Sequence, residues 1–100
     1  MKYTSEKLEE ISYALEGESV NLTYRVLLES MYFSPGVNIR EEENKTYLDI
    51  VRCKVAGTCD VQYVSHFNED GSQSVTIKAP IDPSAVWVEG ENGNKLITDY

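Results

Sequence analysis

The sequence predicts a single α+β domain, residues 1–100, in which two helices pack on one antiparallel sheet of about five strands. Three observations lead to this fold class. A stripe of apolar residues has helical spacing near the N-terminus, a long run of alternating residues follows it, and the second half of the chain holds short strand patterns joined by turns. In chain order the predicted elements are α-β-α-β-β-β-β.

The first helix is predicted to begin near Thr4, whose side chain can cap it, and to end near Gly17. Leu8, Ile11 and Leu15 recur at helical spacing, so one stripe of this helix faces the core.

A long strand is predicted from Val20 to Phe33, because apolar and polar residues alternate there and Ser34-Pro35-Gly36 ends the run. Glu29 lies on the same face of this strand as Met31 and Phe33. A carboxylate on an apolar face must reach water, find a partner within the fold, or meet a molecule that binds later. A solubilising charge on an edge strand is the simpler interpretation of Glu29.

Residues 38–57 fit two structures. Asn38 followed by Glu41 resembles a capping box, and apolar residues recur at helical spacing up to Gly57, which predicts a helix over residues 41–56. Residues 46–51 also alternate as a strand does, and this alternative stays open.

From Asp60 onward the pattern is typical of β structure. Short connections between the strands favour an antiparallel meander. The predicted strands are residues 61–67, 74–78, 85–89 and 95–98, with turns at 68–72 and 90–93.

The chain is acidic, with 17 acids against 9 bases and a formal net charge of −8. This charge repels nucleic acid, so direct binding of DNA or RNA is not expected, whereas a basic protein surface would attract it. Solubility alone also explains such a charge. Without a secretory signal pattern or a long apolar stretch, a cytoplasmic protein without membrane contact is expected, with Cys53 and Cys59 as two buried thiols.

The sequence offers no catalytic constellation. His66 is the one histidine, and no Ser, Cys or carboxylate is placed by sequence to form a triad with it. Glu41, Glu42 and Glu43 would point apart on a helix, which disfavours a shared metal ion. We therefore expect no catalytic residue, no metal and no cofactor, and favour a binding protein over an enzyme.

Three stretches together resemble the phage-encoded uracil-DNA glycosylase inhibitor family. The first is Glu29-Ser30 followed by Met31-Tyr32-Phe33-Ser34 and Pro35, the second is Cys59–Glu69, and the third is Glu91–Ile97 with its Asn-Gly turn. The predicted order of helix, strand, helix and meander also agrees with that family.

The resemblance implies a DNA mimic that occupies the DNA-binding groove of a host uracil-DNA glycosylase in a 1:1 complex in the host cytoplasm. It implies Glu29 as the mimic of a phosphate and Ser30 as its hydrogen-bonding neighbour. The further partner contacts that it implies are Met31, Phe33, Glu41, Glu42 and Asp82. It also implies an apolar pocket between the sheet and the second helix that takes a leucine of the enzyme. The candidate lining of that pocket is Phe33, Val51, Val55, Val75 and Ile77.

Ordinary core packing remains an alternative explanation for these apolar residues. Another acidic inhibitor is the alternative for the function: an anti-restriction or anti-CRISPR mimic, or an immunity protein for a basic toxin. A small enzyme or ligand-binding domain is a third class.

Overall fold

The computed structural model describes residues 1–78 and 80–100, and this part of the chain is built almost wholly from β-strands. Its helical segments are three 3₁₀ helices of three residues each. In chain order the elements are η1 (Ser5–Lys7), β1 (Leu8–Glu16), β2 (Ser19–Val26), β3 (Tyr32–Phe33), β4 (Gly36–Glu42), β5 (Lys45–Ile50), β6 (Cys53–Lys54), β7 (Tyr63–Val64), β8 (His66–Phe67), β9 (Gln73–Ile77), η2 (Pro83–Ala85), β10 (Val86–Val88), β11 (Lys95–Leu96) and η3 (Ile97–Asp99).

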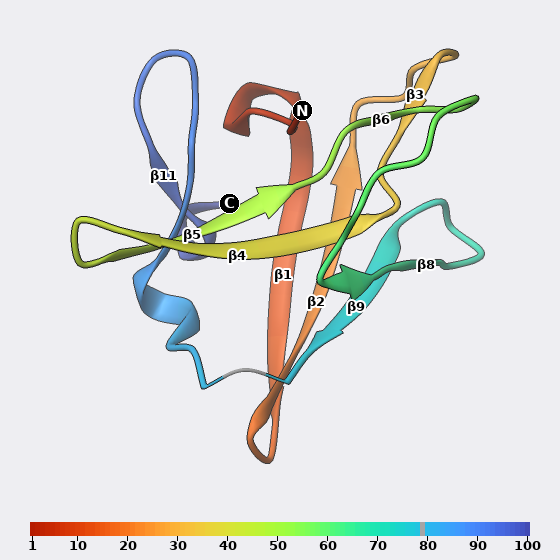
Figure 1. Cartoon of the computed structure of the whole chain (residues 1–100). Coiled ribbons are helices and arrows are strands. Elements are labelled where there is room, and N and C mark those ends of the chain that lie inside the picture. The colour runs from red at the N-terminus through yellow and green to blue at the C-terminus, as the bar shows by residue number, and fades with distance from the viewer. Residues whose placement is uncertain (79) are drawn as a thin grey trace.

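The strands described here form two main sheets and one small pair. The first sheet has the order β1-β2-β9-β8, the second has the order β11-β10-β5-β4-β7, and β3 pairs with β6. In Figure 1 the β4–β5 hairpin runs across the β1–β2 hairpin, so the two sheets cross rather than align. The predicted fold class, α+β with two helices on one sheet, is therefore wrong.

The hydrophobic core lies where the two sheets cross. Alternate side chains of each strand point into it, as the period of two requires. The buried core residues include Ile11, Leu22, Tyr24, Val75 and Ile77 from the first sheet and Val37, Leu48, Ile50, Val86 and Val88 from the second.

The predicted first helix is wrong, because residues 8–16 form β1, which pairs with β2 in an antiparallel hairpin. Leu8, Ile11 and Leu15 have helical spacing, but Ile11 and Leu15 also lie on one face of a strand. A bulge just after Leu8 brings this side chain to the same buried face as Ile11. Gly17 has a φ of +61° in the hairpin turn and stops no helix. The pairing partner, which local spacing does not reveal, decides between the two structures.

The predicted second helix, residues 41–56, is also wrong, and the strand alternative is correct for its central part. β4 and β5 form a hairpin whose turn residues Glu43 and Asn44 have φ values of 52° and 66°. Positive φ at both central positions is the geometry of a tight hairpin turn, and Asn accepts it readily. Glu41 and Glu42 are thus the last residues of β4 and not the start of a helix.

The predicted strand from Val20 to Phe33 is correct only for its first part. β2 ends at Val26, and residues 27–31 form a loop that leads into β3. Glu29 therefore lies in a loop and not on the face of a strand.

The second half of the chain is mainly β structure, but the predicted strands are correct only in part and do not form a meander. The predicted strand 61–67 is two short strands, β7 and β8, and the predicted strand 95–98 ends at Leu96, directly before η3. The chain leaves the five-stranded sheet after β7 and enters the four-stranded sheet as β8, with Ser65 between them. β10 then pairs in parallel with β5. Within the described residues, no helix has the length and apolar character needed to cross a membrane.

A buried polar network joins the two sheets at the places where the chain passes between them. The hydroxyl of Tyr24 on β2 lies 2.8 Å from Ser34 Oγ and 3.0 Å from Ser65 Oγ. The side-chain amide of Gln73 on β9 donates to the carbonyl oxygen of Ser34 at 2.7 Å and to Ser65 Oγ at 2.8 Å. Because buried polar groups need partners, these bonds fix the positions of the two crossing segments that contain Ser34 and Ser65.

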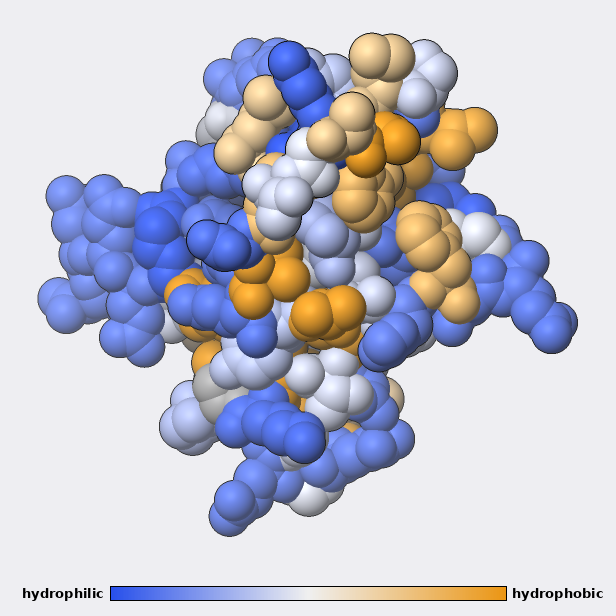
Figure 2. Space-filling view, turned by 45° about the vertical axis from the view of Figure 1, so that its right-hand side comes forward, coloured by the Kyte–Doolittle hydropathy of each residue, from blue (hydrophilic) through white to orange (hydrophobic). Residues whose placement is uncertain are grey.

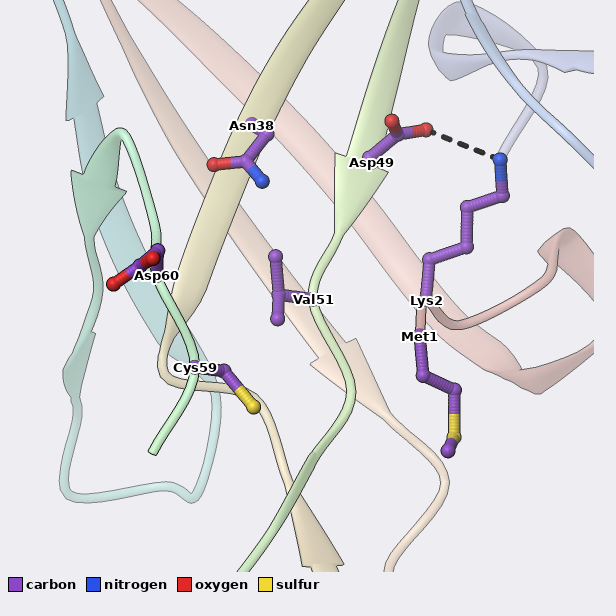
Figure 3. Close-up of a pocket in the computed structure, with 7 residues that line it drawn as sticks. All are labelled: Met1, Lys2, Asn38, Asp49, Val51, Cys59 and Asp60. Carbon is purple, nitrogen blue, oxygen red and sulfur yellow. Dashed lines mark ion pairs between the residues drawn. The ribbon is translucent and has the colours of Figure 1, made fainter. Parts of the chain in front are cut away.

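Ion pairs connect the N-terminus to the second sheet. Arg40 on β4 donates from Nε to Asp49 on β5 at 3.0 Å and also pairs with Glu89 beyond β10. Lys2 Nζ lies 2.8 Å from Glu89 and 3.6 Å from Asp49, and Figure 3 shows the second of these pairs. These charges therefore satisfy one another within the fold.

We predict that Tyr24→Phe lowers the free energy of unfolding by about 1–3 kcal/mol, because the hydroxyls of Ser34 and Ser65 lose a buried partner. Urea denaturation of the wild-type and variant proteins measures this. Tyr13→Phe is the matched control, since Tyr13 is 37% exposed and its hydroxyl makes no hydrogen bond to the described residues. A loss no larger for Tyr24→Phe than for Tyr13→Phe would show that the network contributes little.

Candidate functional site

An apolar pocket of about 170 Å³ lies where the loop after β2 meets β3, β8 and the segment that follows β6. Its lining residues are Val26, Leu27, Leu28, Glu29, Tyr32, Phe33, Ser34, Val55, Phe67, Gly71 and Gln73. Figure 2, in which the right-hand side of Figure 1 is turned forward, shows hydrophobic side chains gathered in its upper half between hydrophilic margins.

Large apolar side chains around this pocket are exposed to water. Leu28 is 94% exposed, Phe67 67%, Val55 62% and Leu27 49%. Single exposed apolar residues are common, but several around one pocket mark a surface that is covered when another molecule binds. We therefore take this pocket as the candidate functional site.

Backbone hydrogen bonds hold the walls of the pocket together. Leu27 N–H donates to the carbonyl of Lys7 at 2.8 Å, and Val55 N–H donates to the carbonyl of Met31 at 3.0 Å. In the antiparallel pairing of β3 with β6, Phe33 lies opposite Cys53. The loop of residues 27–31 is thus fixed at both ends, and the side chain of Val55 is brought to the pocket by strand pairing.

Arg52 secures the middle of the same loop. Its guanidinium donates to both carboxylate oxygens of Glu29, with Nε 2.9 Å from Oε1. The guanidinium carbon lies 3.6 Å from the centre of the Tyr32 ring, within the range of a cation–π contact. The side chains of Glu29 and Arg52 are only 21% and 17% exposed, so this pair is better shielded from solvent than a surface ion pair.

The pair determines the electrostatics of Glu29. The hydrogen bonds from Arg52 hold the pKa of the Glu29 carboxyl below its ordinary value, and the same bonds raise the pKa of Arg52. Of the three possibilities for this carboxylate, the structure shows the second, a partner within the fold. Glu29 is therefore not a free charge in this structure.

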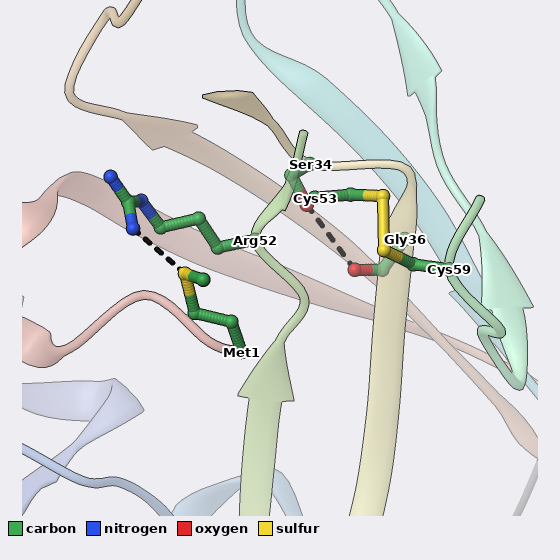
Figure 4. The surroundings of a disulfide bond; sticks show 6 residues. All are labelled: Met1, Ser34, Gly36, Arg52, Cys53 and Cys59. Atoms are coloured by element: carbon green, nitrogen blue, oxygen red, sulfur yellow. Dashed lines mark hydrogen bonds between the residues drawn. A yellow bond between two sulfur atoms is a disulfide. The ribbon is translucent and has the colours of Figure 1, made fainter. Parts of the chain in front are cut away.

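Cys53 and Cys59 form a disulfide, so the expectation of two buried thiols is wrong (Figure 4). Their Cα atoms are 6.0 Å apart, a separation that suits such a bond. The chain turns back between them, where Gly57 N–H donates to the carbonyl of Lys54 at 2.9 Å. The bond closes a short loop that contains Val55 and so supports one wall of the pocket.

The structure places the predicted pocket residues in different parts of the fold. Phe33 and Val55 line the apolar pocket together, although by strand pairing and not through a helix. Val51 lies at a different hollow of about 420 Å³, shown in Figure 3, whose charged lining groups include Lys2 and Asp49. Val75 and Ile77 are core residues of β9, so ordinary packing is the correct interpretation of these two. The prediction of a pocket between a sheet and a second helix is wrong.

The residues predicted to contact a partner also lie in different parts of the fold. Ser30 and Met31 are exposed in the same loop as Glu29. Glu41 and Glu42 end β4 at the tip of its hairpin, which Figure 1 shows on the opposite side of the molecule from β3 and β8.

Asp82 has a local role of its own. Its carboxylate accepts hydrogen bonds from Ser84 N–H at 3.0 Å and Ser84 Oγ at 2.6 Å, caps η2, and has a pKa lowered by these bonds. Capping of η2 therefore explains why an aspartate stands at position 82.

Sequence reasoning missed Arg52, Phe67 and Gln73. Arg52 lies 23 residues from Glu29, and no local pattern connects the two. Among the described residues, no group of three or more His, Cys, Asp or Glu side chains is arranged to hold a metal ion. No protein-family model, curated protein or solved structure matches this chain.

We predict that reducing the disulfide lowers the free energy of unfolding by about 2 kcal/mol, because the short loop between the cysteines gains freedom in the unfolded chain. Urea denaturation with and without dithiothreitol measures this. The double variant Cys53→Ser/Cys59→Ser is the control and should not respond to the reductant. Identical midpoints for the oxidised and reduced wild-type protein would contradict the prediction.

We also predict that the loop of residues 27–31 loosens in acid. Because the folded-state pKa of Glu29 lies below its ordinary value of 4.5, the pair contributes fully above about pH 4.5 and is lost as the pH falls through the lowered pKa. NMR titration of the Glu29 carboxyl carbon and the loop amides measures this. A titration midpoint at or above 4.5, or an equal loop response in Glu29→Gln, would contradict it.

Proposed function

We propose that this chain is a binding protein without catalytic activity, which inhibits a partner by docking the apolar pocket against a basic surface that presents a hydrophobic side chain. One observation carries the proposal: Glu29 and residues 32–34, four of the seven residues in the stretch Glu29–Pro35 that resembles the glycosylase inhibitors, line the pocket. The resemblance and the geometry thus point to the same surface.

The charge of the chain supports a basic partner. A net charge of −8 attracts a positive surface over a distance of about one Debye length and raises the rate of encounter. Glu69 and Asp70 directly precede Gly71, which lines the pocket. Glu69 therefore lies near the apolar contact, whereas Asp70 is paired with Arg25, whose Nη2 lies 3.5 Å from its carboxylate.

The exposed apolar residues support a tight contact once the partner has arrived. Covering one large apolar side chain contributes roughly 1.5–3 kcal/mol, and Leu28, Val55 and Phe67 are all more than half exposed. Such a cluster, closed off from water, is typical of the centre of a protein interface.

A bacterial uracil-DNA glycosylase is the first partner to test. For Glu29 to take the place of a DNA phosphate, its carboxylate must exchange Arg52 for a basic group of the enzyme, or share it with one. The cytoplasm in which such an enzyme works keeps thiols reduced, whereas the Cys53–Cys59 disulfide persists in oxidising compartments. The assay is therefore made with both the oxidised and the reduced protein.

The test is uracil excision by the glycosylase while this protein is titrated in. We expect inhibition that is complete near one equivalent and persists in moderate salt. Val55→Ser should weaken inhibition about tenfold, because it removes apolar surface from the pocket wall. Val64→Ser is the matched control: Val64 is 61% exposed against 62% for Val55, but it does not line this pocket.

Two outcomes would count against the proposal at different levels. If a large molar excess of folded protein does not inhibit the glycosylase, this enzyme is excluded as the partner. The other classes of basic protein that acidic inhibitors bind would then remain as candidates. Capture from a bacterial lysate then decides the general proposal. The proposal requires a protein that binds to the wild type and to Val64→Ser but does not bind to Val55→Ser. If the lysate yields no such protein, the pocket is not a docking surface.

A further inference from the structure

A polar side chain, that of Gln73, lies among the apolar residues of the pocket. Gln73 lines the pocket, yet it is only 2% exposed. Its amide nitrogen donates to the carbonyl of Ser34 and to Ser65 Oγ. Because a carbonyl oxygen only accepts, the nitrogen must face Ser34, and the orientation of the amide is fixed.

The amide oxygen of Gln73 is left without a hydrogen-bond partner among the described residues. The side-chain atoms there that are both fully buried and unpaired are the hydroxyls of Tyr3 and Thr4, so this oxygen retains some contact with open space. The pocket is the space that Gln73 lines. We therefore place this oxygen at the pocket, where its fixed position makes it a hydrogen-bond acceptor among walls that are mostly apolar.

The acceptor is held rigidly. Ser34 and Ser65 both contact the hydroxyl of Tyr24, and Ser34 Oγ also donates to the carbonyl of Gly36 at 3.2 Å. Rotation of the Gln73 amide would break two buried hydrogen bonds. A preorganised acceptor of this kind selects the group that satisfies it.

The size of the pocket limits what can enter. A cavity of about 150 Å³ lined by Leu, Ile and Phe is sufficient for benzene, so a pocket of about 170 Å³ takes one aromatic ring. Phe33 and Phe67 offer ring faces and edges for aromatic contact.

We propose that the pocket binds the side chain of a tyrosine on the partner, with its ring between Phe33, Val55 and Phe67 and its hydroxyl donating to the amide oxygen of Gln73. This inference rests on the proposed function for its source, a protein partner, but it replaces the leucine that the resemblance to the glycosylase inhibitors implies with a tyrosine. An aliphatic side chain would fill the same space but would cover the acceptor without satisfying it, which is unfavourable. Tyrosine is also common among the central residues of protein interfaces.

Two peptides that differ by one hydroxyl test the proposal: acetyl-Lys-Tyr-Lys-amide and acetyl-Lys-Phe-Lys-amide, whose lysines suit the acidic protein. Binding is followed by the amide NMR shifts of Phe33, Val55 and Gln73 in the ¹⁵N-labelled full chain. We expect the tyrosine peptide to bind about three- to tenfold more tightly, the range that one added hydrogen bond provides. Val55→Ser should weaken its binding, and Val64→Ser should leave it unchanged.

Equal or tighter binding of the phenylalanine peptide would overturn the inference, as would shifts that avoid the three pocket amides. Titration with p-cresol separates the sources of the phenol. If p-cresol binds as tightly as the tyrosine peptide, the pocket is a site for a small phenolic molecule and the protein source is wrong. A preference for tyrosine together with no Val55-dependent protein partner would contradict the proposed function and leave the phenol site standing.

Discussion

The buried hydroxyl of Tyr24 is the point on which the crossing of the two sheets depends. Ser34 and Ser65 lie in two of the segments that pass between the sheets, and both contact this hydroxyl. Gln73 is the fourth residue of the network and also lines the apolar pocket. The same hydrogen bonds therefore fix the fold and shape the site, so the pocket is as rigid as the junction beneath it.

The second half of the chain could be predicted from sequence because its strands are bounded by clear turn signals, such as the glycine at position 71 with a φ of +86°. The first half could not. Leu8 and Ile11 fit a helix, and only the pairing of β1 with β2 makes them strand residues. Glu43-Asn44 is a hairpin turn, but a run of glutamates is equally typical of a helix N-terminus. Local patterns leave such choices open, and tertiary pairing decides them.

The structure brings two of the predicted pocket residues together, but for a reason that differs from the expected one. Phe33 and Val55 do meet at a pocket, but β3–β6 pairing and a disulfide bring them together where a helix was predicted. Arg52 could not be assigned to Glu29, because the spacing of an ion pair across a fold leaves no mark in the sequence. The acids Glu41 and Asp82 do not line the pocket, since Glu41 pairs with Thr46 in the β4–β5 hairpin and Asp82 caps η2.

The Glu29–Arg52 pair changes what the acidity of this chain does for binding. A carboxylate that is already neutralised adds little to the field outside the molecule, and its exchange to another cation gains only the difference between two similar ion pairs. Under the proposed function, the net charge of the chain would act at a distance and speed encounter with a basic partner, and salt would weaken this attraction. Discrimination between basic partners must then come from short-range contacts. Under the proposed function, the apolar pocket and the fixed amide group of Gln73 are the features of this surface that would provide them.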